Sequence, residues 1–258
     1  MRVLLPAVAL LALVLGLPHA APLFHAAWPA LSHPVYVRTS FTVLTLSHVA
    51  LVLAATAVAA LAGLCLGVLV TRPMGRALLP TVRAVAVIGQ TFPPVAVLAI
   101  AVPLLGFGAA PTLLALALYG VLPVLGQTVA GLDNVPAAAL HAADGMGYGR
   151  WRRLREIELP LAIGPIMAGI RLSAIVGVGT ATIGSTVGAT TLGSPIVEGL
   201  VGNNTAYVIQ GALLVGALAL TLDGALQYLE RRLTTPPDRI TKLDRLTTLD
   251  RLTTPDRM

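Results

Sequence analysis

Charged residues are scarce in this 258-residue sequence, which also contains a single cysteine and a single lysine. Only 11% of its residues are charged, whereas soluble domains carry about 25%. Hydrophobic residues make up 56% of the chain. This composition excludes an ordinary soluble domain and predicts an all-α integral membrane protein that crosses the bilayer several times.

The single copies of cysteine and lysine exclude two kinds of chemistry. With Cys65 alone, no disulfide can form within the chain, and we expect this residue to fill a small buried space. The only lysine is Lys242, so the sequence contains no Gly-Lys-Ser/Thr motif of a phosphate-binding loop. Any ATP hydrolysis linked to this chain must therefore come from a different subunit.

Motifs for a catalytic or metal site are also lacking. The sequence has no nucleophile elbow, no His-x-x-Glu-His motif and no paired His and Cys. His19, His25 and His33 lie close in sequence, but their spacings of six and eight residues place them on no common helical face. We therefore expect no enzymatic activity, no cofactor and no metal.

Acidic residues are absent between Arg2 and Asp133, so the orientation must be read from arginine alone. The net charge of +6 comes from short basic loops between apolar runs, which favours membrane orientation over nucleic-acid binding. If the chain has six spans, four arginine-containing segments fall on one side: Arg2, residues 72–83, residues 150–155 and Arg231–Arg232. Both termini are then cytoplasmic, and Arg38 alone lies outside.

The apolar runs predict a helical bundle of about six transmembrane helices. We expect the first, residues 3–17, to be retained, with a cleaved signal peptide as the alternative. The second is expected from about His48, after an interfacial lead-in from Phe41, because the uncharged run is longer than one span needs. The third ends near Leu105, and the last three cover about 111–132, 160–187 and 206–229, with an outer loop over residues 189–204 between the last two.

Three regions follow from these spans. Residues 1–40 form an N-terminal helix and an outer segment, and residues 41–233 form the transmembrane domain, with its main cytoplasmic loop at 137–160. Residues 234–258 repeat an Asp-Arg pair every six residues and contain little apolar mass. This pattern predicts a disordered cytoplasmic tail, with a short amphipathic helix as the alternative.

Two spans contain features of a translocation path. The third is interrupted by Gln90, Pro93, Pro94 and Pro103, and prolines inside a span free carbonyl groups that must find partners in protein or water. An ordinary kink is the alternative. The fifth ends in a run of small and hydroxylated residues, 177–194, which suits a tight helix seam, a polar wall or both.

Ionisable residues within spans are costly and mark functional sites. Arg171 lies eleven residues after Pro160, about 16 Å along a helix, and Asp223 lies near the end of the sixth span. We expect an Arg171–Asp223 pair at an inner gate, with snorkelling to the interface as the alternative. The full set of path or gate candidates is Gln90, Thr91, Phe92, Pro93, Pro94, Arg171, Thr180, Thr182, Ser185 and Asp223.

The one long polar interruption is HAADGMGYGRWRRLREIELP, residues 141–160. Its spacing is Ala-Ala, three residues, Gly, nine residues and Ile-x-Leu-Pro, which selects Ala142, Ala143, Gly147, Ile157, Leu159 and Pro160. This pattern resembles the EAA loop of permease subunits of ATP-binding-cassette importers. The resemblance implies a coupling helix that docks on a cytoplasmic ATPase, although His141 stands where that family has Glu.

Further segments extend the resemblance over residues 40–230. The runs GQTFPP, YGVLP, ELPLAIGPIMAGIR and TATIGSTVGATTLGSPI are similar to permeases of osmoprotectant importers. The resemblance implies a type I importer fold in a bacterial inner membrane, with a second permease copy or paralogue, ATPase subunits and an external solute-binding protein. The implied cargo is glycine betaine, choline or a related compound. Methionine or another amino acid is the alternative cargo. A stand-alone secondary transporter or a membrane anchor is the alternative function.

Overall fold

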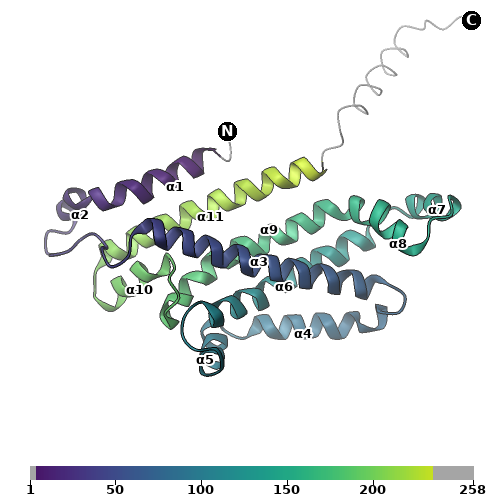
Figure 1. Cartoon of the computed structure of the whole chain (residues 1–258), viewed down its shortest axis with the longest axis horizontal. Coiled ribbons are helices and arrows are strands. Elements are labelled where there is room, and N and C mark those ends of the chain that lie inside the picture. Colours follow the sequence, from purple (N-terminus) through teal and green to yellow (C-terminus); the bar gives the residue numbers. More distant parts are fainter. Residues whose placement is uncertain (1–3, 235–258) are drawn as a thin grey trace, which may run out of the picture.

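The computed structural model describes residues 4–234, with the side chain of Gln90 excepted (Figure 1). Within this range the regular elements are all helical, which confirms the predicted all-α fold. The predicted tail, residues 234–258, lies outside the described residues apart from Thr234.

Among the described residues, four helices are long and apolar enough to cross a membrane. They are α3 (Phe41–Thr71), α6 (Ala109–Asp133), α9 (Leu159–Ile183, within a longer helical run) and α11 (Thr205–Thr234). Two bent pairs raise the number to six if each pair is one span. The pairs are α1 (Leu4–Gly16) with α2 (Ala21–Ala27), bent by 77°, and α4 (Leu79–Thr91) with α5 (Pro94–Leu105), bent by 89°.

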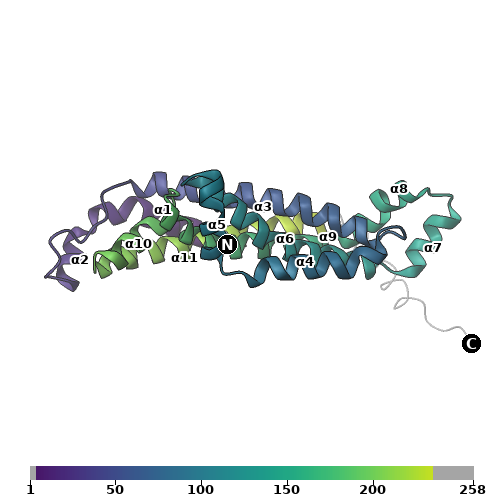
Figure 2. The same ribbon diagram turned by 90° about the horizontal axis from the view of Figure 1, so that it is seen from below.

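The shorter helices lie at opposite ends of an elongated bundle. α7 (Ala137–Gly145) and α8 (Arg150–Arg153) project from one end, and α2 and α10 (Gly193–Val201) lie at the other (Figures 1 and 2). The sequence had predicted a loop over residues 189–204, which is wrong in part because α10 occupies its middle. The two ends correspond to the predicted cytoplasmic and outer sides.

The start of α3 differs from the sequence prediction. The helix begins at Phe41 and not near His48, because the Ser40 hydroxyl accepts a hydrogen bond from the Val43 N–H (3.3 Å) and caps the first turn. Its 31 residues rise about 46 Å, more than the roughly 30 Å of a hydrocarbon core. The expected lead-in is therefore helical.

The third predicted span is two helices at a steep angle. α4 and α5 meet at Phe92 and Pro93, where the backbone is extended. Two consecutive prolines remove two backbone donors and disfavour helical geometry in the residue before them, so the helix cannot continue. Pro103, by contrast, lies inside α5.

The fifth predicted span begins earlier than expected. α8 continues through a π-helical turn, Leu154–Glu158, directly into α9. Pro160 occupies the first turn of α9, as predicted, but no new helix starts there. The π turn lies directly ahead of the proline, and the helix continues from it into α9 without a break.

The core is formed by α3, α6 and α9, which make the most extensive contacts, with α11 packed against α9. Small residues allow the close approach of α3 and α6: a Cβ built on Gly63 would lie 2.7 Å from Val124 Cβ, and one on Gly67 2.6 Å from Thr128 Cγ2. Cys65, between these glycines, is exposed on the opposite face of α3, so its predicted burial is wrong.

Replacing Gly63 by alanine is expected to lower the thermal unfolding midpoint of the purified chain in detergent. The added methyl would meet both Val124 Cβ and the backbone nitrogen of Leu125 (2.9 Å), and such overpacking costs about 1–3 kcal/mol. Gly126→Ala on α6 is the matched control, because a Cβ there meets nothing within 4 Å. Equal midpoints for the two variants would show that the α3–α6 seam is not tightly packed.

Candidate functional site

The polar stretch folds into two short helices joined by a tight turn at Gly147. Tyr148 N–H donates to the Ala143 carbonyl and Met146 N–H to the Ala142 carbonyl, each at 3.0 Å, which closes the end of α7. Gly147 has φ 76°, a left-handed conformation that residues with a side chain rarely adopt. The turn therefore depends on glycine at this position.

The motif residues divide into an outward and an anchored half. His141, Ala142 and Gly147 are exposed at the tip, whereas Ala143 is fully buried. In the second half, Ile157 and Leu159 are half-buried and Pro160 is exposed. Leu159 packs against a small apolar cluster of Leu132, Leu154, Ala162 and Ile166. The tip is thus presented to a partner by a firmly held base.

A buried carboxylate ties this base to the loop after α3. Glu158 is 4% exposed and accepts from Arg72 Nη2 at 2.6 Å and from Arg153 Nε at 3.0 Å. Arg153 Nη1 also donates to both carboxylate oxygens of Asp144, at 2.8 and 2.9 Å. Burial raises the pKa of Glu158, but the hydrogen bonds and charges of Arg72 and Arg153 outweigh it, so the pKa lies below its usual value.

The sequence did not predict this cluster. In the sequence, the arginines indicated only the cytoplasmic side. Arg72 and Glu158 are 86 residues apart, so no local pattern links them. The only local signal was the pair Glu156 and Glu158 directly behind the arginine cluster.

An exposed apolar surface lies beside α8. A cavity of about 300 Å³ is lined by the end of α3 and by α8 residues, and polar groups contribute little to its wall. Met74 is 93% exposed and Trp151 80% exposed at its rim. Large apolar side chains left in the open next to a basic loop are typical of a protein contact or a membrane interface.

Arg171 and Asp223 lie together, as predicted from the sequence, with Arg171 Nε 3.7 Å from Asp223 Oδ1. Glu230, which the sequence analysis missed, lies about two turns further along α11, with Oε2 3.4 Å from Arg171 Nη1. One arginine of α9 thus joins two carboxylates of α11.

The other path candidates are not brought together in one wall. Thr91 Oγ1 donates to the Ile88 carbonyl, the Phe92 carbonyl accepts from Tyr119 Oη, and Pro93 and Pro94 make the bend between α4 and α5. The side chain of Gln90 lies outside the described part of the structure.

The hydroxyl-rich end of α9 divides in the same way. Thr180 and Thr182 donate to carbonyls of their own helix, at 3.0 and 2.6 Å, and not across an interface. Ser185 instead lies in a network beyond α9, with its Oγ 2.7 Å from Thr191 Oγ1 and 3.2 Å from Ser194 Oγ. The run therefore serves the tight seam at one end and a polar outer surface at the other.

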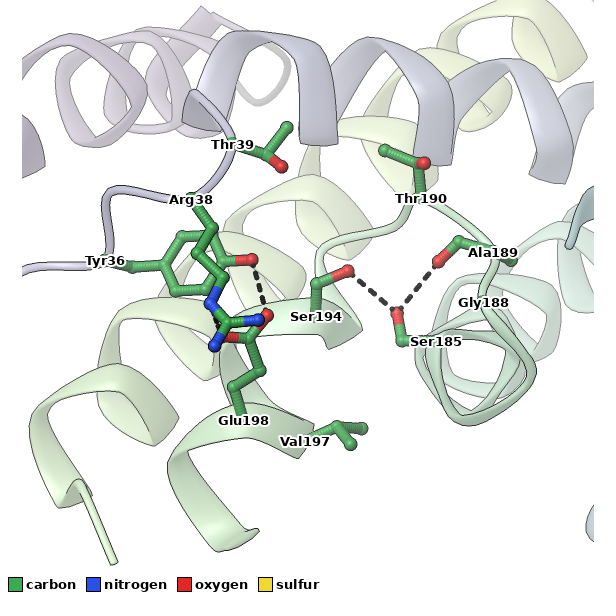
Figure 3. Close-up of a pocket in the computed structure, with 10 residues that line it drawn as sticks. All are labelled: Tyr36, Arg38, Thr39, Ser185, Gly188, Ala189, Thr190, Ser194, Val197 and Glu198. Atoms are coloured by element: carbon green, nitrogen blue, oxygen red, sulfur yellow. Dashed lines mark hydrogen bonds and ion pairs between the residues drawn. The ribbon is translucent and has the colours of Figure 1, made fainter. Parts of the chain in front are cut away.

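The outer segment before α3 is held to α10 and α11 by polar contacts. Tyr36 Oη donates to Glu198 Oε1 at 3.0 Å, and Arg38 Nε lies 3.0 Å from Glu198 Oε2 (Figure 3). Gln210 accepts from the Tyr36 N–H at 3.0 Å and donates to the Pro34 carbonyl at 2.6 Å. Burial and then the Glu198 carboxylate raise the pKa of Tyr36 to about 12, so its hydroxyl remains a donor at physiological pH.

A buried histidine connects three segments near the same end. His48 on α3 is fully buried; its Nδ1 accepts from the Leu192 N–H at 3.2 Å, and its Nε2 lies 3.1 Å from the Val178 carbonyl. Because Nδ1 is an acceptor, the ring is neutral and carries its proton on Nε2. His48 thus joins α3 to α9 and to the start of α10.

Comparisons with known proteins agree on one family. The model of the family described as binding-protein-dependent transport system inner membrane component matches residues 63–235. Over 187 residues the chain is 38% identical to the osmoprotectant import permease protein OsmY of Salmonella typhimurium, covering 72% of this chain and 79% of that one. It is 42% identical to the glycine betaine/carnitine/choline transport system permease protein OpuCB of Bacillus subtilis, covering 66% and 81%.

Solved structures show the same fold. An inward-facing structure of the MetNI methionine ABC transporter has a chain that matches with a TM-score of 0.69 and 22% identity, covering 78% of this chain and all of that one. A structure of an amino acid ABC transporter matches with a TM-score of 0.60 and 19% identity, covering 73% and 92%. At such identities the likeness extends to the fold alone, and it confirms the predicted importer-type bundle.

Proposed function

This chain belongs to the family of binding-protein-dependent transport system inner membrane components, and we propose that it is the permease subunit of an ATP-driven osmoprotectant importer. The exposed α7–α8 turn carries the proposal. The turn contains Gly147 and lies at the end of the bundle opposite to α10 (Figure 1), on a base that includes the Glu158 ion pairs. Such a rigid, projecting element can transmit force from a docked ATPase to the helices that it continues.

The docking surface is proposed to be the tip of the α7–α8 turn. His141, Ala142 and Gly147 supply its exposed part, and the apolar rim with Met74 and Trp151 lies alongside. α8 continues into α9 without a break, so a pull on the turn moves the helix that bears Arg171. No residue of this chain is needed for ATP hydrolysis, which belongs to the partner.

The cargo is proposed to be a quaternary ammonium osmoprotectant such as glycine betaine or choline. The support is the naming of relatives that are 38–42% identical: osmoprotectant import, and glycine betaine, carnitine or choline transport. The methionine and amino acid transporters match at 22% identity or less, which makes an amino acid the weaker candidate. An external binding protein and a second permease copy complete the proposed assembly.

The Arg171 junction is proposed to be an inner gate. One arginine contacts Asp223 and Glu230 on α11, so a small rotation of α9 can exchange one ion pair for the other. The ATPase must bind the inward- and outward-facing states with different affinity, since a ligand shifts an equilibrium only by that difference. Thr180, Thr182 and Ser185 and the bend at Phe92–Pro94 are proposed to line the path.

Co-purification with an ATPase subunit tests this proposal. The chain, expressed with the cytoplasmic ATPase of an osmoprotectant importer, is expected to retain it through affinity purification in detergent. A stand-alone transporter or a membrane anchor would be recovered without any ATPase, and that result would contradict the importer function.

The orientation is tested by reporter fusions. We expect fusions at Ala109 and Thr190 to report an external position and fusions at Gly75 and Gly149 a cytoplasmic one, because arginine-rich loops remain inside. Alkaline phosphatase and green fluorescent protein activities measure the two sides. A cytoplasmic signal at Ala109 would mean that the α4–α5 pair does not cross the membrane.

A further inference from the structure

Arg38 is the one arginine that the predicted orientation leaves on the outer side, and it precedes the part of the chain that the family model matches. Its side chain is 77% exposed, yet its Nε is 3.0 Å from the Glu198 carboxylate. An ion pair this exposed adds little to stability. The membrane topology and the fold therefore give no reason for an arginine at this position.

Two cavities meet at the Arg38–Glu198 pair, and both residues line each of them. The first, of about 260 Å³, is also lined by the hydroxyl residues Ser185, Thr190 and Ser194 (Figure 3). The second, of about 360 Å³, is also lined by His33, Asn204 and Tyr207. The positive and the negative group are thus both open to small molecules.

The two cavities differ in chemistry. In the first, a guanidinium group that uses Nε for Glu198 shares the cavity with three hydroxyl groups, a combination that suits a carboxylate. In the second, the Glu198 carboxylate stands near Tyr207, and a carboxylate with an aromatic ring suits a quaternary ammonium. Tyr207 is held edge-on to Tyr36, with ring centroids 5.4 Å apart.

We propose that this outer end is a binding site for betaine-type zwitterions, in which Arg38 receives the carboxylate and Glu198 with Tyr207 receives the quaternary ammonium. The proposal rests on the osmoprotectant function proposed above and adds a selective step within the permease itself. Bound in this way, the solute replaces the internal ion pair by two intermolecular ones, so the net charge of the site is unchanged. Choline has no carboxylate and uses only the Glu198 half.

The surrounding contacts hold the site in place before a solute arrives. The Gln210 amide fixes the backbone at Pro34 and Tyr36, and Asn204 Nδ2 donates to the His33 carbonyl at 2.9 Å. Tyr36 Oη orients the Glu198 carboxylate. Since little ordering remains to be done on binding, a small solute can be held by few contacts.

The test is ligand-observed saturation-transfer NMR on the full-length chain in lipid nanodiscs, with glycine betaine and choline as probes. The wild type is expected to bind both. Arg38→Gln is expected to weaken glycine betaine binding about tenfold, the loss of one charge-assisted contact, and to change choline binding less than about twofold. Tyr36→Phe is the comparison variant: it removes the hydroxyl that orients Glu198 but neither charge, so any loss of binding is expected to be equal for the two solutes.

Two results would overturn the proposal. One is a wild type that binds no glycine betaine. The other is an Arg38→Gln variant that weakens the binding of both solutes equally, which is the result expected if the Arg38–Glu198 ion pair only holds the outer segment in place. ATP-driven uptake is measured separately on the assembled importer. A chain that binds glycine betaine with this selectivity but does not transport it contradicts the proposed function and leaves the binding site standing.

Discussion

Replacing Gly147 by aspartate is expected to abolish solute uptake and solute-stimulated ATP hydrolysis while leaving membrane insertion unchanged. Gly147 has φ 76°, where a side chain adds backbone strain of about 1 kcal/mol or more. A Cβ here meets nothing within 4 Å in the isolated chain, so the added carboxylate points into the space that the docked ATPase is proposed to occupy. Strain and obstruction act together at one contact.

Two alanine variants separate these causes. Gly147→Ala introduces the strain with little bulk and is expected to weaken ATPase retention only in part. Gly145 lies two residues away, its backbone is outside the left-handed region, and a Cβ added there meets nothing within 4 Å. Gly145→Ala is therefore expected to behave as wild type. The measurements are pull-down of the ATPase and uptake in membrane vesicles. Normal binding and uptake by Gly147→Asp would mean that this turn is not the coupling element.

Replacing Glu158 by glutamine is expected to have the second-largest effect. The change leaves Arg72 and Arg153 without their shared carboxylate at the base of the coupling turn. Removing one member of a buried ion cluster costs about 3–5 kcal/mol when all partners are buried, and about 2 kcal/mol is expected here because both arginines are partly exposed. We expect a lower thermal midpoint and uncoupled, largely solute-independent ATP hydrolysis.

Glu156→Gln is the control, since Glu156 and Arg152 form an exposed pair one turn apart on the surface of the same segment. It is expected to leave the thermal midpoint and the coupling ratio unchanged.

The depressed pKa of Glu158 also fixes a pH dependence: its contribution to stability is present above the unfolded-state pKa of about 4.3 and is lost as the pH falls through the lower folded-state value. Equal thermal midpoints for Glu158→Gln and Glu156→Gln would contradict the structural role of Glu158.

The sequence predicted the helical bundle, and it singled out the polar loop at 141–160, because both depend on local information. Apolar runs of span length and a fixed motif spacing lie within short stretches of chain. The start of α3 was predicted less well, because an uncharged run longer than a bilayer is thick does not show where the helix begins. Ser40, a good helix cap, was the one local signal for the true start. The prediction that Cys65 is buried was wrong because α3 is apolar on all sides, so the sequence of the helix does not indicate which face is packed.

Long-range contacts were harder to predict. The Arg171–Asp223 pair was found because charges within spans are few and must be compensated. The Glu158 cluster and the Arg38–Glu198 pair were missed because their members lie in polar segments, where a charge needs no special reason. The run 177–194 was predicted to form a tight helix seam, a polar wall or both, and the sequence did not show that α9 ends within it or that its hydroxyls have different neighbours.

Uptake into proteoliposomes that contain the chain, its ATPase and its binding protein tests the central claim most directly. With glycine betaine as solute, uptake is expected to require ATP on the side of the membrane that carries the ATPase. It is also expected to persist when ion gradients are collapsed. Uptake that proceeds without the ATPase and follows an imposed ion gradient would contradict the account, because the chain would then be a transporter working alone.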